Sequence, residues 1–171
     1  MQKNKTVSFM YTEKESDRNI DNQINLAKDS EKKQRDKIYI RADMNEIIAT
    51  GHIMRCLAVA DAAKEMGKET IFITADEKPV EMLRSRGYEP IILHTEWNNM
   101  ESELESLILL IQKESITKLL VDSYQVTKEY LAKLEKYTEV YYLDDLDAFE
   151  YVGKALYEKR VELPDLLAIS K

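Results

Sequence analysis

Short apolar runs alternate with longer amphipathic stretches along the middle of the chain. The apolar runs have the length and residue types of β-strands, and they cover residues 38–41, 70–74, 90–93, 118–121 and 140–143. The stretches between them repeat apolar residues at helical spacing, over residues 51–67, 79–87, 100–114 and 128–136. Strands and helices that alternate through short turns form βαβ units. The pattern therefore predicts an α/β fold with a doubly wound parallel sheet of about five strands, in the order 3-2-1-4-5.

Two flanking segments do not share this pattern. Residues 1–36 are dominated by charged and amide side chains, which cannot bury enough apolar surface to offset the entropy of the chain. We interpret them as a polar leader or linker. Residues 151–171 interrupt the alternation, because 153–161 predicts a charged helix and no sixth βα unit follows. The expected organisation is one Rossmann-like domain over residues 37–150, between a leader and a divergent C-terminal tail.

Composition narrows the class of protein. A chain of 171 residues, 44% of them hydrophobic, has room for one domain with a proper core. The net charge of −7 and the lack of a basic stripe argue against a nucleic-acid partner. No apolar run is long enough to span a membrane, and the polar N-terminus lacks the apolar core of a signal peptide. A single cysteine cannot form an internal disulfide, so we expect a cytoplasmic protein.

Polar side chains crowd the ends of the predicted strands. In an open parallel sheet the ligand crevice lies at the carboxyl ends of the strands, near the switch point between strands 1 and 4. The residues that follow strands 1, 4 and 5 are Asp43, Asn45 and the turn 49–52, then Asp122, Ser123 and Tyr124, then Asp144 and Asp145. This concentration predicts a polar ligand.

The turn before the first helix carries the main candidate chemistry. Gly51 lets the backbone approach a ligand, and the N–H groups of a first helical turn favour an anion such as phosphate. His52 is the only side chain there that could move a proton near neutral pH. The alternative is that Gly51 only tightens a turn and His52 only caps the helix.

Other candidates have a simpler structural interpretation. Cys56 beside Leu57 is expected to be a small buried residue, and His94 a surface or rim residue. The Asp144–Asp145 pair lacks a nearby His or Cys, so a turn role is favoured over a metal site. Arg55 either contacts a phosphate or pairs with an acidic neighbour.

Three separated motifs, in order, resemble one family of enzymes. They are Ile40-Arg41-Ala42-Asp43 with Thr50-Gly51-His52-Ile53-Met54-Arg55-Cys56-Leu57-Ala58, then Val121-Asp122-Ser123-Tyr124, then Tyr142-Leu143-Asp144-Asp145-Leu146. The family is that of the UDP-2,4-diacetamido-2,4,6-trideoxy-β-L-altropyranose hydrolases of pseudaminic acid synthesis. The Gly-His turn alone also resembles two-Rossmann-domain glycosyltransferases, including the enzyme that adds N-acetylglucosamine to lipid-linked muramoyl peptides.

The resemblance implies a fold, a reaction and a set of site residues. It implies two Rossmann-like domains around a cleft (a glycosyltransferase-B-type fold), and water that attacks the anomeric carbon with inversion and release of UDP. No metal or cofactor is implied. The catalytic residue would be His52, which orients or deprotonates the water. The substrate-binding positions would be Asp43, Asn45, Gly51, Arg55, Ser123 and Tyr124.

The chain also departs from that family. Met44 and Ala49 stand where the family usually has glycines, which predicts a stiffer loop. The family continues after Asp144-Asp145-Leu146 into a C-terminal domain with most of the uridine contacts, and that pattern is lost after Tyr151. We therefore expect the UDP-sugar hydrolase to be incomplete in this chain alone, with a complementing C-terminal domain on another chain as a possible partner. A sugar-transferring relative and a non-catalytic remnant remain as alternatives.

The leader carries a weaker resemblance. Residues 10–16 and 19–25 resemble the C-terminal end of CMP-sialic-acid-type cytidylyltransferases, which act in the same nonulosonic acid pathways. The resemblance implies a fused cytidylyltransferase–hydrolase shortened at both ends. An unrelated linker is the alternative.

Overall fold

The computed structural model describes residues 23–26, 28–29, 37–143 and 154–156, and the chain divides into two units. The first unit is Met1–Gln34, in which residues 23–26 and 28–29 are helical. The polar composition of the leader does not predict this helical segment. The rest of the prediction for residues 1–36 falls outside the described residues. The second unit, Arg35–Lys171, contains the whole sheet.

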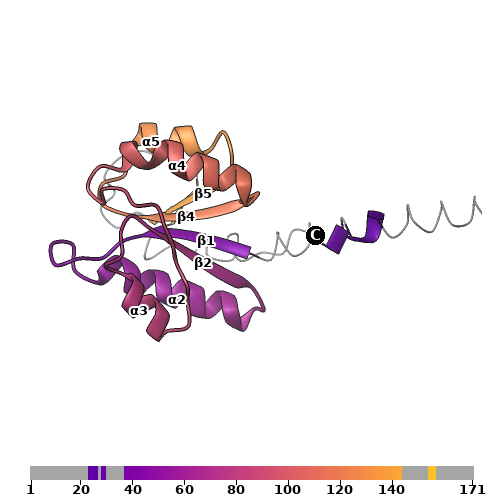
Figure 1. The fold of residues 1–171 in the computed structure, drawn as a ribbon, viewed down its shortest axis with the longest axis horizontal. Helices are drawn as coiled ribbons and strands as arrows, with labels where there is room; N and C mark the ends of the chain where they lie inside the picture. The colour runs from indigo at the N-terminus through magenta and orange to yellow at the C-terminus, as the bar shows by residue number, and fades with distance from the viewer. Residues whose placement is uncertain (1–22, 27, 30–36, 144–153, 157–171) are drawn as a thin grey trace, which may run out of the picture. The chain divides into compact units, whose positions relative to one another are not determined.

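A six-stranded parallel sheet forms the centre of the second unit (Figure 1), in the order β3-β2-β1-β4-β5-β6. Its strands are β1 (Lys37–Ala42), β2 (Glu69–Thr74), β3 (Ile91–Ile92), β4 (Lys118–Asp122), β5 (Glu139–Leu143) and β6 (Lys154–Leu156). The predicted α/β class and the order of the first five strands are confirmed. β3 is shorter than the predicted strand over residues 90–93.

The sixth strand corrects the expectation for the tail. The predicted helix over residues 153–161 is wrong at Lys154–Leu156, which pair in parallel with Tyr141, Tyr142 and Leu143 of β5. A free strand edge presents unpaired backbone N–H and C=O groups. Pairing with that edge is a tertiary interaction, and such interactions override the weak helix preference of a short charged segment.

Helices cover both faces of the sheet. They are α2 (Gly51–Glu65), α3 (Val80–Ser85), α4 (Met100–Lys113) and α5 (Lys128–Leu134). Figure 1 shows α2 and α3 on one face and α4 and α5 on the other. The strands alternate accordingly, since Ile38 and Ile40 of β1 pack in the core with α2, whereas Tyr39 packs in the core with α4 and α5. No helix among the described residues is long and apolar enough to cross a membrane.

Candidate functional site

The site lies where the sheet order reverses. β1 pairs with β2 on one side and β4 on the other, and the register places Ala42 beside Asp122. Asp43 follows β1, so Asp43 and Asp122 share the carboxyl edge of the sheet, as predicted. Asp144, predicted on the same edge, lies outside the described residues.

His52 and Asp122 form a buried pair at this edge. His52 is the second residue of α2, and its side chain is 3% exposed. Its Nδ1 lies 2.6 Å from Oδ1 of Asp122. Nη2 of Arg55 also lies 3.0 Å from Nδ1. In the tautomer whose Nδ1–H donates to the Asp122 carboxylate, Nε2 keeps a lone pair. Nε2 is buried and has no hydrogen-bond partner among the described residues, so it can accept a proton from a ligand or a water.

Arg55 supplies the counter-charge to Asp122. Its Nε donates to Oδ2 of Asp122 at 2.5 Å, and its Nη2 donates to Oδ1, the atom that also accepts from His52. Of the two interpretations of Arg55, pairing with an acid is the one observed in this structure. Arg55 fixes the position of the Asp122 carboxylate, and the carboxylate in turn fixes the plane of the His52 imidazole ring.

Cys56 completes the surroundings of Asp122. Its side chain is fully buried, as expected, and its Sγ donates to Oδ2 of Asp122 at 3.4 Å. Burial, followed by the Asp122 charge, raises the pKa of the thiol well above its ordinary value of 9.0. Cys56 is therefore a neutral thiol that packs beneath the site.

The loop between β1 and α2 is shaped by Asn45. Its Oδ1 accepts from the backbone N–H groups of Ile47 (2.8 Å) and Ile48 (3.0 Å), and its backbone bridges to Ala49. Ala49 has φ 55°, a left-handed conformation that costs about 1–2 kcal/mol in a residue with a Cβ. The Asn45 Nδ2 is buried without a partner among the described residues, which leaves a donor for a ligand.

Gly51 begins α2 and faces open space. A Cβ built at this position would meet no atom within 4 Å. Thr50 makes no side-chain capping hydrogen bond, and the first turn contains no acidic residue. The start of α2 is therefore suited to an anionic group. The role of Gly51 in approaching a ligand stays a prediction.

Asp43 faces the protein interior. Its Oδ1 accepts from the backbone N–H of Ala75 at 2.8 Å, and its Oδ2 accepts from Nη1 of Arg41 at 2.5 Å. Burial raises the pKa of its carboxyl above the ordinary value, although Arg41 opposes that shift. Because both oxygens are engaged, Asp43 supports the loop rather than presenting a free carboxylate to a ligand.

Two residues after β4 have different roles. The Oγ of Ser123 accepts from the backbone N–H of Gln125 at 3.1 Å, so Ser123 shapes the turn. Tyr124 is half exposed, and its ring packs edge-on against His52 with 4.3 Å between ring centroids. Tyr124 thus lies beside the His52 imidazole. His94 is not part of this site: its side chain is 72% exposed and lies next to Glu77, as expected for a surface residue.

A buried ionic cluster beside the site was not predicted from the sequence. Arg41 of β1 is fully buried; its Nε and Nη2 donate to the two oxygens of Glu103 at 2.8 and 2.6 Å. The hydroxyl of Tyr130 donates to Glu103 at 2.7 Å. Burial alone would lower the pKa of Arg41, but Glu103 and Asp43 raise it above its ordinary value.

A signal for this cluster was present in the helical pattern. Glu103 stands in the apolar stripe of α4, at the spacing shared by Met100, Leu104, Leu107 and Ile111. An acid in such a stripe indicates a buried cationic partner, because a lone buried carboxylate is strongly unfavourable.

Comparison with known proteins finds a similarity to a solved structure. No family model and no curated protein matches the chain. Its structure is similar to that of formyltetrahydrofolate deformylase from Burkholderia mallei, with a TM-score of 0.41 and 13% identity. The similar region covers 61% of this chain and 36% of that one, so the chain spans little more than a third of that protein.

Proposed function

We propose that this chain is the N-terminal half of a nucleotide-sugar hydrolase, one that releases UDP from a diacetamido-trideoxy-hexose in the cytoplasm. The observation that carries the proposal is the buried His52–Asp122 pair, with 2.6 Å between Nδ1 and Oδ1, in which Nε2 of the imidazole has no hydrogen-bond partner within the described part of the chain. Hydrolysis of a sugar phosphate needs one group that holds or deprotonates a water beside the anomeric carbon.

The surrounding residues suit the substrate class. The open start of α2 offers backbone N–H groups to a diphosphate, and the empty space before Gly51 leaves room for it. The Nδ2 of Asn45, which has no partner among residues 37–143, is a donor for a sugar hydroxyl or an acetamido carbonyl. In this mechanism Asp122 and Arg55 position His52, and the Tyr124 ring moves off the imidazole so that a water reaches the buried Nε2. Nε2 then accepts a proton of the water, the water oxygen bonds to the anomeric carbon, and UDP leaves as an anion.

At this edge of the sheet the described residues offer a nucleotide one helix terminus and a few polar side chains. A helix terminus contributes about 0.3–1 kcal/mol per exposed anionic contact, whereas millimolar binding needs about 4 kcal/mol and micromolar binding about 8 kcal/mol. A half-cleft also leaves the anomeric carbon in bulk water, without the enclosure that holds an attack geometry. We therefore expect the isolated chain to bind UDP no tighter than millimolar and to release no UDP from the diacetamido sugar nucleotide.

The test is reconstitution with a complementing C-terminal half from a hydrolase of the family. Turnover should appear in the mixture and fall about 100- to 10,000-fold with His52→Ala, the range for loss of a general base. His94→Ala is the matched control, since it removes the other histidine at an exposed position, and it should leave turnover unchanged. Activity that survives His52→Ala would overturn the catalytic assignment.

Two further results would redirect the proposal. Micromolar binding of UDP to this chain alone, measured by calorimetry, would contradict the half-site argument. Transfer of the sugar to an acceptor in place of release to water would favour the glycosyltransferase alternative. A mixture that folds and associates but neither hydrolyses nor transfers would favour a non-catalytic remnant.

A further inference from the structure

Two side chains of α2 hold the buried carboxylate of Asp122. Nδ1 of His52 lies 2.6 Å from its Oδ1, and Nε of Arg55 lies 2.5 Å from its Oδ2. Nη2 of Arg55 contacts the same Oδ1 and also lies 3.0 Å from Nδ1 of His52. The guanidinium therefore touches both the imidazole ring and the carboxylate that orients it.

The charges of these three groups decide how many protons the imidazole holds. A buried carboxylate alone favours an imidazolium beside it, because the added proton turns an isolated negative charge into an ion pair. With Arg55 in place the Asp122 charge is already compensated, so a second ring proton would leave a net positive charge on a histidine that is only 3% exposed. The guanidinium also faces Nδ1, and a like charge at that distance disfavours the imidazolium.

The other described groups in contact with this pair are uncharged. The thiol of Cys56 donates to Oδ2 of Asp122 at 3.4 Å and is neutral, as argued above. The aromatic ring of Tyr124 packs edge-on against the imidazole. Among these contacts, Arg55 is therefore the group that opposes the pull of Asp122 on a second proton.

We propose that Arg55 is a positioning residue that keeps His52 neutral at physiological pH. A ring with protons on both nitrogens has no lone pair at Nε2 and cannot accept a proton from water. Arg55 thus preserves the lone pair that a general base requires. The use of this lone pair as a base rests on the proposed function, whereas the charge state of the ring does not.

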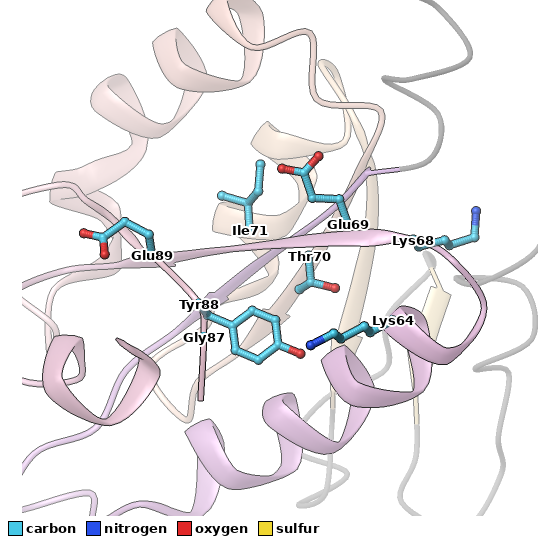
Figure 2. A pocket seen from close by; sticks show the side chains of 8 residues that line it. All are labelled: Lys64, Lys68, Glu69, Thr70, Ile71, Gly87, Tyr88 and Glu89. Atoms are coloured by element: carbon cyan, nitrogen blue, oxygen red, sulfur yellow. The ribbon is translucent and has the colours of Figure 1, made fainter. Parts of the chain in front are cut away.

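A second arginine–carboxylate pair of the same kind supplies a matched control. It lies at a pocket of about 330 Å³ between the end of α2, the start of β2 and the turn after α3, where Glu89 is one of the lining residues (Figure 2). Nε of Arg84 donates to Oε2 of Glu89 at 2.8 Å, and both side chains are exposed. His52 is at the other end of α2 from this pocket. Arg84→Gln therefore removes the same charge and the same kind of pair at a distance from the imidazole.

The test is ring-nitrogen NMR of the isotopically labelled full chain at neutral pH, which separates protonated from unprotonated imidazole nitrogens. In the wild type we expect one nitrogen of each kind at His52. Arg55→Gln should remove the signal of the unprotonated nitrogen, because Asp122 then stabilises the imidazolium. Arg55→Lys keeps the charge and should keep that signal.

Two further variants separate charge from packing. Combining Arg55→Gln with Asp122→Asn removes both charges, so the unprotonated signal of His52 should return, and Arg84→Gln should never lose it. Persistence of the signal in Arg55→Gln would overturn the proposal. A doubly protonated ring in the wild type would also overturn it, whatever the variants do. Because these spectra need no turnover, failure of the reconstituted hydrolase would leave them valid, and failure here would leave the hydrolysis test open.

Discussion

Arg41 and Glu103 form a two-bond pair whose side chains are both 0% exposed, with Nε–Oε1 and Nη2–Oε2 distances of 2.8 and 2.6 Å. The pair joins the central strand β1 to α4, which covers one face of the sheet. Its arginine also holds Asp43, the first residue of the loop that leads to His52. The position of the candidate site is therefore tied to a buried charge pair on a different element.

Removing one partner of this pair should destabilise the domain. Glu103→Ala leaves the Arg41 guanidinium buried with only Asp43 as a counter-charge, and breaking a buried pair in this way typically costs about 3–5 kcal/mol. The measurement is the urea midpoint of unfolding. Glu105→Ala, an exposed acid on the same helix, is the control and should change stability by less than about 0.5 kcal/mol. Equal effects of the two substitutions would contradict the structure.

Two glycines should respond in opposite ways to alanine. Gly51→Ala adds a methyl group in open space at the start of a helix. The free energy of unfolding should therefore stay unchanged or rise by up to about 1 kcal/mol. Gly67→Ala places a Cβ on a residue with φ +74°, and should cost about 1–2 kcal/mol. Denaturant midpoints of the two variants give the comparison. A large loss of stability for Gly51→Ala would show that this glycine serves the fold and not a ligand.

The two histidines should differ in their reactivity with diethyl pyrocarbonate, which acylates neutral imidazole. His94 is 72% exposed and should react at once, whereas His52 is 3% exposed and must wait for local opening. An opening cost of about 1.4 kcal/mol slows the reaction about tenfold. Tyr124→Ala removes the ring that packs on His52 and should restore much of that rate, with His94 as the internal reference. Equal rates in the wild-type chain would refute the burial of His52.

Alkaline pH should destabilise the domain through Cys56. The thiol pKa in the folded state is raised well above 9.0, so above that pH the thiol ionises in the unfolded chain and stays protonated in the folded one. Its contribution to stability is full below pH 9 and is lost as the pH rises toward the folded value, by about 1.4 kcal/mol per pH unit. The measurement is the difference in unfolding free energy between wild type and Cys56→Ala from pH 8 upward, and a flat difference would contradict the prediction.

The sheet and the place of His52 could be predicted because both depend on local patterns. Strand runs, helical spacing and polar strand ends are properties of neighbouring residues, and they located Asp43, His52 and Asp122 at one edge. The direction of a side chain is a tertiary property, so the pattern could not show that Asp43 turns inward toward Arg41. The strand β6 was not predicted for the same reason, because its pairing depends on the free edge of β5.

The place of β1 at the centre of the sheet has a consequence for the nascent chain. Tyr39 pairs with Ile71 on one side and with Leu119 on the other, so β1 is synthesised long before its second neighbour exists. At about 5–20 residues per second, the apolar strand waits several seconds on the ribosome with one edge unpaired. Such non-local pairing also slows folding after release. The connectivity that brings His52 and Asp122 together therefore sets a window during translation in which the chain is open to aggregation.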